Sequence, residues 1–582
     1  MSKIPYGISN FKLIRDKSEK YLYIDKTHFL QELEKQRYLI HLRPRRFGKS
    51  LFLSMMDNYY DIASADEFDD LFSGLYVHEY PTNDKNNYYI LRFNFSGVQN
   101  VNEGDLEAGF TVKIRDGIRS FINRYDFDIT VNNSRLSADF LSDFLTKFSA
   151  LKLPNKIYLL IDEYDHFTNS VLNGDGEAFL EVLRRGGFVR SFYEVIKEHT
   201  EIGNIERFFI TGVMSVTLDS MTSGFNIAKN ITANQNFSDI MGFTATEVKE
   251  ILNSTFTEIA RQREKQTIEQ SKKMRLTEQE QCDIFEIFKE NYNGYLFSEE
   301  DDTKIFNSTL IMYYLNAYIS TRKPPKNLID PNLNQSGTTI ANIVQLKMPE
   351  ENQALIREIV EEKEIVGELQ PFINIDLKFD QNDVITMLYN IGILTIKPSH
   401  MGNLFQMPNK TIQRTYLQYL SDLLKRQLDY HFDTRKLTVA FRELGEKGQL
   451  TKLTKIVEDI LFHASNRNYR ELDEAHIKNM YFVLTYITED FVVYDEQPAG
   501  NGYADVFIQR SLTSRAKYEA LIEFKYLKKK EITNEKIEEK MVEGRKQLTA
   551  YLKDERLSSR LDLRKYVILF SGSEAIRIEE VC

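Results

Sequence analysis

The 582-residue sequence contains no tryptophan and only two cysteines, Cys282 and Cys582, which lie far apart in the chain. Two cysteines cannot form a disulfide framework, and so few suit a reducing compartment. No apolar run reaches the roughly 20 residues that a membrane-spanning helix needs. Residues 1–10 also lack the apolar core of a signal peptide. We therefore expect a cytoplasmic protein that does not engage membranes.

The chain also lacks an excess of positive charge, because 75 Lys and Arg stand against 86 Asp and Glu and give a formal net charge of −11. This balance argues against a protein that coats nucleic acid indiscriminately, but it permits local basic patches. Two concentrations stand out: Arg43, Arg45 and Arg46 near the start, and Lys525, Lys528, Lys529 and Lys530 near the end. A lysine run is as typical of a solvated face as of a binding surface.

Short β-rich runs alternate with helical stretches in the first part of the chain, which predicts a parallel sheet with crossover helices. Buried strands are expected at residues 37–42, 88–95, 157–161 and 207–214, and a shorter strand is expected near 237–243. Repeats and low-complexity tracts are absent. We expect an α/β domain over residues 1–243, a charged helical lid over 244–320, a helix-rich middle region over 321–450 and a second α/β unit over 451–582.

Residues 43–50 (RPRRFGKS) lie between a predicted strand and a predicted helix. A glycine there lets backbone N–H groups approach phosphate oxygens, Lys49 would reach the β- and γ-phosphates, and Ser50 would bind magnesium. The following helix adds the positive end of its dipole. One departure is Arg43, which stands where the usual motif has glycine. A bare Gly-Lys-Ser also occurs often by chance, but its place after a buried strand favours a phosphate loop.

A partner motif follows at residues 157–163 (IYLLIDE), where an apolar strand ends in two acids. Asp162 would hold the magnesium through Ser50 or water, and Glu163 would polarise the attacking water. The alternative is an ordinary strand-end turn. Residues 211–215 (TGVMS) end the next strand, where a polar side chain could sense the γ-phosphate. Arg184, Arg185 and Arg190 could stabilise transferred charge, although surface salt bridges are the commoner role for such arginines.

A second constellation of acids lies near the end of the chain. Asp505 sits in a Gly-started strand, and Glu523 and Lys525 share one face of the next strand because residues two apart point the same way. Pairing of the two strands would bring Asp505 beside Glu523, and two carboxylates suit magnesium or manganese. Lys525 would orient or activate a water. The alternative is an amphipathic hairpin with a surface salt bridge, but acids in apolar strands are unexpected.

Neighbouring helices offer candidates for further roles at this second constellation. An upstream helix at about residues 469–488 carries Glu471 and Glu474, and either could be a third acid. A downstream helix carries Gln547 and Tyr551, four residues apart on one face. Each of these residues taken alone is also compatible with a plain surface position.

Four segments together resemble a family of bacterial proteins in which an AAA-ATPase-like domain precedes a PD-(D/E)XK nuclease-superfamily domain. They are residues 23–27 (YIDKT), 43–50 (RPRRFGKS), 292–297 (YNGYLF) with Phe306 and Asn307, and Asp505 with 523–525 (EFK). In this family arginine at the position of Arg43 is the rule. The resemblance extends over roughly residues 4–310 and 455–575 and leaves the middle unmatched.

The resemblance implies an α/β P-loop ATPase with a parallel sheet, a helical lid and a C-terminal PD-(D/E)XK-type nuclease domain. ATP and magnesium are the expected cofactors, with manganese an option at the nuclease site. Nucleotide contacts are expected from Arg46, Phe47, Gly48, Lys49, Ser50, Leu51 and Asp162, with metal ligands Ser50, Asp162, Asp505 and Glu523 and catalytic groups Glu163, Asp505, Glu523, Lys525 and Gln547.

The resulting hypothesis is ATP-regulated cleavage of phosphodiester bonds in nucleic acid, in DNA rather than RNA, with a role in defence or mobile-element biology as a further expectation. Nucleotide would bind between subunits of a homo-oligomer or against the chain's own lid. Two alternatives stay open: a regulatory ATPase whose C-terminal domain binds nucleic acid without cutting it, and a nucleotide-controlled scaffold in which both sites are inactive.

Overall fold

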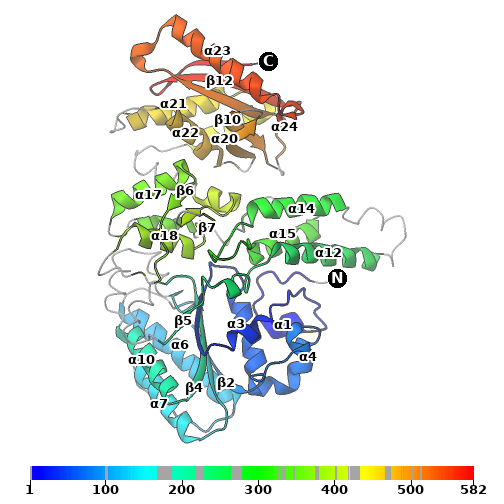
Figure 1. Cartoon of the computed structure of the whole chain (residues 1–582), viewed down its shortest axis with the longest axis vertical. Coiled ribbons are helices and arrows are strands. Elements are labelled where there is room, and N and C mark those ends of the chain that lie inside the picture. Colours follow the sequence, from blue (N-terminus) through cyan, green and yellow to red (C-terminus); the bar gives the residue numbers. More distant parts are fainter. Residues whose placement is uncertain are drawn as a thin grey trace. The chain divides into compact units, whose positions relative to one another are not determined.

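The computed structural model divides the chain into two compact units, Met1–Gln413 and Arg414–Cys582 (Figure 1). It describes residues 3–98, 103–132, 134, 136–166, 187–215, 227–263, 278–321, 323–325, 327–330, 336–344, 346, 348–371, 373, 379–399, 403–416, 419, 433–465, 473–486, 488, 490–499, 502–511 and 514–581. Within these residues no helix is both long and apolar enough to cross a bilayer.

A five-stranded sheet, in the order β2-β3-β4-β1-β5, forms the centre of the first unit. All of its strand pairs are parallel, as the sequence predicted. Its strands are β1 (Tyr38–Leu42), β2 (Tyr88–Asn94), β3 (Lys156–Asp162), β4 (Ile205–Gly212) and β5 (Lys229–Asn230). The central strands are almost entirely buried apolar residues, because crossover helices cover both faces of a parallel sheet.

Helices lie on both sides of this sheet (Figure 1). The helices α3 (Lys49–Tyr60), α1 (Phe11–Arg15) and α4 (Phe68–Phe72) lie on one side, and α6 (Glu103–Arg124), α7 (Ser137–Ala150) and α10 (Gly187–Glu201) lie on the other. In such a sheet the carboxyl ends of the parallel strands meet at one edge, which is where ligands bind. The loop at residues 43–50, the acids after β3 and the exit of β4 therefore share one edge.

The short strand expected near residues 237–243 is not formed, and that prediction was wrong. Gln235–Phe237 is a 3₁₀ turn, and Phe243 makes only an isolated antiparallel bridge to Phe306. The fifth strand is instead Lys229–Asn230, which pairs with Leu39 and Ile40 of β1. Both of its residues are exposed, so the strand carries no apolar pattern from which it could be predicted.

The subdomain after the sheet contains the helices α12 (Ala245–Arg263), α14 (Glu278–Asn291) and α15 (Ser308–Thr321). The start of the chain packs against their shared core through Ile4, Tyr6, Leu22 and Ile24. Lys26, within the motif at residues 23–27, forms a buried ion pair of 2.6 Å with Glu247 at the start of α12. That motif therefore fastens the chain's beginning to the helical subdomain.

The middle region completes the first unit with α16 (Ser336–Val344), α17 (Pro349–Glu361), α18 (Gln381–Asn390) and a small antiparallel sheet in the order β6-β8-β7. Its strands are β6 (Glu364–Val366), β7 (Thr395–Lys397) and β8 (Leu404–Gln406). It packs on the motif at residues 292–297, because the Leu296 N–H donates to Thr395 Oγ1 at 2.7 Å and Asn409 Nδ2 donates to the Asn293 carbonyl at 2.7 Å.

The second unit contains a five-stranded sheet in the order β13-β12-β11-β10-β9. Its strands are β9 (Phe491–Ala499), β10 (Gly502–Arg510), β11 (Glu519–Tyr526), β12 (Leu563–Ser571) and β13 (Glu574–Glu580). Only β11 and β12 run parallel, and the long helix α23 (Asn534–Tyr551) connects them. Met541 and Leu548 of α23 pack with Leu521 and Val567 on one face of the sheet.

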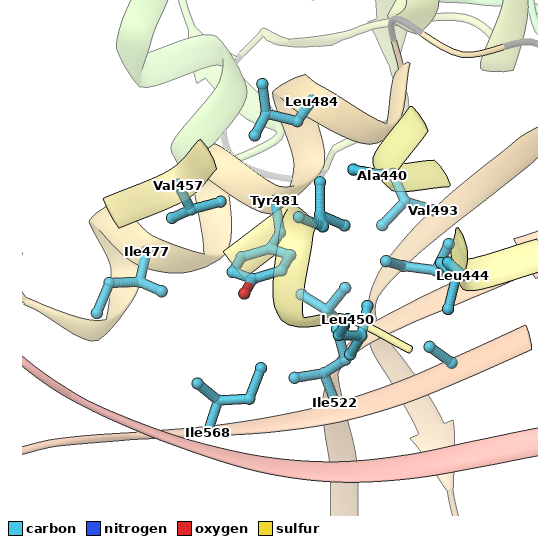
Figure 2. Close-up of a cluster of buried hydrophobic side chains, with 14 of the residues drawn as sticks. Ala440, Leu444, Leu450, Val457, Ile477, Tyr481, Leu484, Val493, Ile522 and Ile568 are labelled. Atoms are coloured by element: carbon cyan, nitrogen blue, oxygen red, sulfur yellow. The ribbon is translucent and has the colours of Figure 1, made fainter. Parts of the chain in front are cut away.

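The other face is covered by the helices α20 (Thr434–Lys447), α21 (Thr451–Ser465) and α22 (Glu474–Tyr486). Figure 2 shows the apolar side chains of these helices meeting those of the sheet. Ala440 and Leu444 of α20 lie beside Val493 of β9, and Tyr481 of α22 lies near the centre. Because α20 shares this core, the unit starts before the expected boundary at residue 451. From the sequence we placed residues 434–447 in the middle region, because the many charged residues of this helix obscure its apolar pattern.

Gly294 is a position at which only glycine fits. Its φ is 96°, and an added Cβ would lie 2.0 Å from the Pro408 carbonyl oxygen. We expect Gly294→Ala to destabilise the first unit by about 3 kcal/mol or more, since backbone strain adds to a steric clash. Gly203→Ala is the matched control, because Gly203 has φ 83° but no atom within 4 Å of an added Cβ, and it should cost only about 1 kcal/mol. Urea unfolding measures both, and equal losses would contradict the clash.

Candidate functional site

The segment at residues 43–50 joins β1 to α3 at the carboxyl edge of the parallel sheet. It turns through two left-handed backbone positions, Arg46 with φ 69° and Gly48 with φ 95°. Gly48 is the residue before the first turn of α3, so Lys49, Ser50 and Leu51 begin that helix. The structure therefore brings the expected loop to the positive end of a helix dipole, where anions bind.

Arg43, the residue in the place of the usual glycine, is fully buried. Its guanidinium donates to the carbonyls of Thr232 and Phe237 at 2.8 Å each, and it lies 4.0 Å from the centre of the Phe297 ring. Burial lowers the Arg43 pKa to about 10, so the group stays charged at neutral pH. Arg43 thus anchors the loop to its surroundings and does not face a ligand.

Two of the expected nucleotide-contacting side chains point elsewhere. Phe47 is buried edge-on against Tyr295 and Phe297, with ring centres 4.9 and 5.4 Å away. The Arg46 side chain forms an ion pair of 3.0 Å with Asp330, and its carbonyl accepts the Thr309 hydroxyl at 2.8 Å. These two residues can contribute backbone groups to a phosphate site, while the Arg46 side chain pairs with Asp330 and the Phe47 side chain packs on the segment at residues 292–297.

Lys49 is folded back onto its own loop. Its Nζ donates to the carbonyls of Arg43 and Pro44, at 2.9 Å each. Burial lowers the Lys49 pKa to about 8, although the nearby carboxylates Asp165, Asp162 and Glu163 act in the opposite direction. To reach a phosphate, Lys49 has to exchange these two carbonyls for phosphate oxygens.

Asp162 ends β3 and is completely buried. Neither of its carboxylate oxygens has a normal hydrogen bond from any residue that the structure describes. Burial raises the Asp162 pKa, and the neighbouring Ser50 hydroxyl and Arg92 guanidinium lower it. An unsatisfied buried carboxylate beside a serine hydroxyl is the donor set that magnesium takes in a nucleotide site, so these residues fit that cation.

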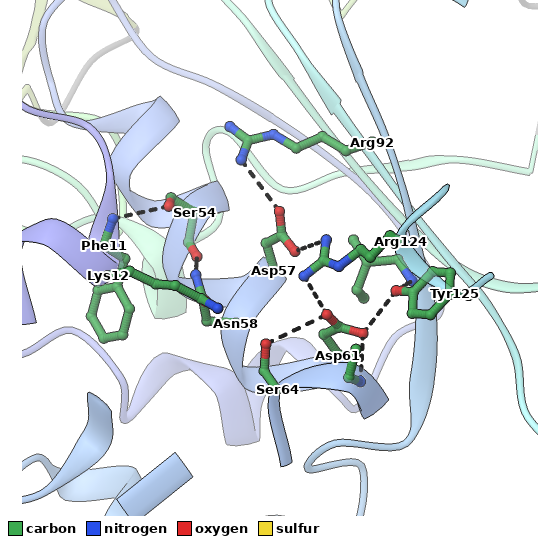
Figure 3. A network of polar contacts seen from close by, with 12 residues as sticks. Phe11, Lys12, Ser54, Asp57, Asn58, Asp61, Ser64, Arg92, Arg124 and Tyr125 are labelled. Carbon is green, nitrogen blue, oxygen red and sulfur yellow. Dashed lines mark hydrogen bonds and ion pairs between the residues drawn. The ribbon is translucent and has the colours of Figure 1, made fainter. Parts of the chain in front are cut away.

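Arg92 connects Asp162 to a polar network between helices of the first unit, and Figure 3 shows the part of this network formed by Asp57, Asp61, Arg92 and Arg124. Arg92 of β2 lies 3.9 Å from Asp162 and 3.4 Å from Asp57 of α3, and Asp57 also pairs with Arg124 of α6 at 2.8 Å. Arg124 in turn contacts Asp61. Sequence reasoning missed Arg92, because a single arginine in a strand carries no spacing signal.

Glu163 follows Asp162 with a left-handed φ of 50°. Its Oε2 lies 3.0 Å from His166 Nδ1, and this contact with His166 is the main reason that the Glu163 pKa is lowered. Non-glycine residues in this conformation are sparse and gather at functional sites. Glu163 is therefore held as a carboxylate, and His166 is a partner that the sequence did not reveal.

The exit of β4 is fastened to the same region. Asp165 accepts the N–H groups of Val213 and Met214 at 3.0 and 2.7 Å. An added Cβ on Gly212 would lie 2.3 Å from Asp165 Oδ1, so glycine is needed there. The buried Thr211 hydroxyl has no hydrogen-bond partner among the described residues. Thr211 thus lies at the edge where a γ-phosphate sensor was expected.

The structure gives no support to the expectation that an arginine of this region stabilises transferred charge. Arg190 is exposed on α10 and pairs with Glu194, one turn later, at 2.9 Å. Arg184 and Arg185 lie outside the described residues. Arg190 therefore has the alternative role that the sequence offered for these arginines, a surface salt bridge.

In the second unit, antiparallel pairing of β10 and β11 brings Asp505 and Glu523 together. The register pairs Val506 with Ile522, and Asp505 Oδ2 accepts the Phe524 N–H at 2.8 Å. Burial, followed by the Asp505 charge, raises the Glu523 pKa to about 7. The adjacency of the two acids that the strand pattern predicted is therefore present.

Lys525 and the helix α23 complete the surroundings of Glu523. Lys525 Nζ bonds to Glu523 Oε1 at 2.7 Å, which confirms that the two side chains share a face. Glu523 Oε2 and the buried Gln547 Oε1 have no hydrogen-bond partner among the described residues. Tyr551 lies one turn after Gln547, and burial, followed by the nearby Glu523 charge, raises the Tyr551 pKa well above its usual range.

The upstream helix supplies Glu474 and an unforeseen lysine. Burial, followed by the Asp505 charge, raises the Glu474 pKa, so Glu474 adjoins the pair. Lys478, one turn later, lies 3.5 Å from Glu474 and contacts Asp505 Oδ1 directly. Glu471, the other candidate acid, lies outside the described residues. The spacing of Glu474 and Lys478 is a common helix pair, and nothing in it indicated a contact with Asp505.

The oxygen donors here suit a hard divalent cation such as magnesium or manganese. Glu523 Oε2 and Gln547 Oε1 are unsatisfied, and the Asp505 carboxylate is adjacent. A group of three or more His, Cys, Asp or Glu arranged to hold a metal is not found in the described part of the chain. The fit rests on the Asp505–Glu523 pair, and water would have to supply further ligands.

Comparison with protein families identifies two domains in this chain. Residues 5–222 match the family described as predicted AAA-ATPase, AAA-ATPase-like, and residues 472–580 match the PD-(D/E)XK nuclease superfamily. The chain is thus an AAA-ATPase-like domain fused to a PD-(D/E)XK nuclease-superfamily domain, as its motifs predicted. It is 31% identical over 249 residues to the uncharacterized protein in the vnfD 5′ region of Azotobacter chroococcum mcd 1. That match covers 42% of this chain and 44% of the relative.

The lowered Lys49 pKa predicts a pH dependence of nucleotide binding. Lys49 loses its proton as the pH rises through about 8, so binding above this pH requires proton uptake. We expect the Kd for ATP to rise about tenfold per pH unit above 8, as fluorescence titrations at pH 7.5 and 9 can measure. Lys49→Met should bind weakly at both pH values. Equal wild-type affinities at pH 7.5 and 9 would contradict this assignment.

The raised Glu523 pKa predicts a pH dependence of stability. A carboxyl group with a folded pKa of about 7 and an ordinary unfolded pKa stabilises the fold when protonated, and that contribution is lost as the pH rises through 7. In metal-free buffer the second unit should lose on the order of 1–3 kcal/mol between pH 5.5 and 8 relative to Glu523→Gln. Denaturant unfolding of both proteins at the two pH values measures this difference, and parallel pH profiles would refute it.

Proposed function

We propose that the chain is an ATP-regulated, divalent-metal-dependent nuclease that cleaves phosphodiester bonds in nucleic acid, with DNA preferred over RNA. The observation that carries the proposal is the Asp505–Glu523–Lys525 group. Two adjacent buried carboxylates and an ammonium 2.7 Å from one of them are costly to fold, and no apolar packing role accounts for them.

The first unit would bind ATP with magnesium at the carboxyl edge of its sheet. Lys49 and the N-terminal turn of α3 would hold the phosphates, while Ser50 and Asp162 would hold the cation. Glu163 is kept ionised by His166 and would orient the attacking water, since its carboxylate is available as an acceptor. Thr211 would donate to the γ-phosphate from the end of β4.

The second unit would position the phosphodiester beside Asp505 and Glu523. A magnesium or manganese ion bound by these carboxylates would supply Lewis-acid stabilisation of the phosphate. Lys525 would hold a water or hydroxide near the scissile phosphate and offset its negative charge. Gln547 would bind substrate or water through its unsatisfied amide oxygen and its NH₂ group.

Nucleotide binding would regulate cleavage through the packing around the loop. Arg43, Arg46 and Phe47 attach the loop to residues 232–238, Asp330 and the segment at residues 292–297. Exchange of the Lys49 contacts for phosphate would therefore disturb the helical subdomain and the middle region. A cytoplasmic location and a homo-oligomer that completes the nucleotide site are part of the same proposal.

The proposal predicts that two variants separate the two activities. Glu523→Gln should reduce metal-dependent cleavage of plasmid or linear DNA by at least about 100-fold, because it removes a metal-binding carboxylate, while ATP turnover stays near the wild-type rate. Lys49→Ala should abolish ATP turnover and the effect of ATP on cleavage. Glu535→Gln, an exposed residue at the start of α23, is the control and should match the wild type.

The same assays, run on DNA and RNA with magnesium or manganese, discriminate between the candidate functions. If the wild type cuts no substrate but binds nucleic acid and hydrolyses ATP, the C-terminal domain binds without cutting. If ATP turnover of the wild type equals that of Lys49→Ala and no substrate is cut, the chain is a nucleotide-controlled scaffold. Preferential cleavage of RNA would overturn the DNA assignment alone.

A further inference from the structure

Lys478 forms a cationic contact inside the acidic group of the second unit. It lies on α22, one turn after Glu474, and its Nζ contacts Asp505 Oδ1 and lies 3.5 Å from Glu474 Oε1. Its role matters only if Asp505 binds a metal, so this inference rests on the proposed function.

The hydrogen bonds of Asp505 determine what a metal would meet there. Asp505 Oδ2 accepts the Phe524 N–H at 2.8 Å, whereas Oδ1, the oxygen that faces away from this backbone bond, is contacted by Lys478. At Glu523, Oε1 is bonded to Lys525, and Oε2 is without a hydrogen-bond partner among the described residues. The Lys478 ammonium therefore competes with a divalent cation for Asp505.

The two lysines of the group differ in how easily they can leave. The Lys525 side chain is 7% exposed and bonds to both Glu523 and the Phe524 carbonyl, within one strand. The Lys478 side chain is 25% exposed and extends from a helix on a flexible four-carbon stem. Lys478 can move toward Glu474 and solvent, whereas movement of Lys525 would break its bonds to Glu523 and to the Phe524 carbonyl.

We propose that Lys478 is a built-in competitor for the divalent cation at the Asp505–Glu523 pair. Without metal, its ammonium neutralises Asp505 and offsets the repulsion between the acids. A divalent cation that binds Asp505 displaces the ammonium, which then pairs with Glu474. Lys478 thus weakens metal binding and makes the site dependent on the free metal concentration.

The test measures Mn²⁺ binding to the full-length chain without nucleotide or nucleic acid, by electron paramagnetic resonance of free Mn²⁺. Lys478→Met should bind Mn²⁺ about tenfold more tightly than the wild type, because a like charge a few ångströms from the metal is removed. Its metal-free melting temperature should be lower and its metal-induced rise larger. Binding that Glu523→Gln removes identifies the site and separates it from metal bound in the first unit.

Lys447→Met is the matched control, because Lys447 also follows a glutamate by four residues, with 3.9 Å to Glu443, and its side chain is 63% exposed. It should leave Mn²⁺ affinity unchanged. Lys478→Gln should reproduce the tighter binding of Lys478→Met, and it serves in its place if the methionine variant does not fold.

Unchanged or weaker Mn²⁺ affinity in folded Lys478 variants would overturn the inference, and would make Lys478 a substrate-binding or purely structural residue. Tighter Mn²⁺ binding in those variants supports it. The binding assay contains no nucleic acid, so its result does not depend on cleavage. If the variants bind Mn²⁺ more tightly but the wild type cuts no substrate, the role of Lys478 is supported and only the proposed nuclease activity is overturned.

Discussion

An ionised carboxylate inside a protein costs several kcal/mol unless a cation or hydrogen-bond donors compensate it. Asp162, Asp505 and Glu523 all lie inside their sheets, and both units are arranged around this constraint. Asp505 is compensated by the Phe524 N–H and Lys478, and Glu523 by Lys525. Near Asp162 lie the Arg92 guanidinium, 3.9 Å away, the Ser50 hydroxyl and the Lys49 charge. The negative charge that these groups leave uncompensated at each site is what a divalent cation would neutralise.

The loop at residues 43–50 in the first unit is under a second constraint, because the surrounding structure holds it at several points. Arg43 bonds to carbonyls near residues 232–238, Phe47 packs on Tyr295 and Phe297, and the Arg46 carbonyl receives the Thr309 hydroxyl. Gly392 of the middle region also approaches this loop, because an added Cβ there would lie 2.9 Å from Pro44. Packed elements of this kind shift between discrete arrangements rather than deforming smoothly. The segment at residues 292–297 therefore packs on this loop through Tyr295 and Phe297.

Much of the architecture could be predicted from local pattern. The runs that become β1 to β4 are rich in buried apolar residues, and the acids of β10 and β11 interrupt apolar strands. The predictions that differ from the structure concern elements whose buried residues leave no clear pattern in the sequence. The strand β5 is too short and too exposed to leave a pattern, and α20 joins the second unit through a buried face that its charged residues hide. Lys478, Arg92 and His166 were missed because each contributes through a contact made by folding.

The sequence alone determined which groups are present and how they lie along each element: Lys49 and Ser50 at the start of a helix, Asp162 at the end of a strand, and Glu523 and Lys525 on one strand face. These follow from backbone periodicity, which is local. Tertiary structure decided which groups meet, since strand pairing and helix packing join residues far apart in the chain. It turned Phe47 and Arg43 into anchors, folded Lys49 onto its own carbonyls and placed Lys478 against Asp505. Long-range contacts set the partner of each charge, because burial removes the water that would otherwise solvate it.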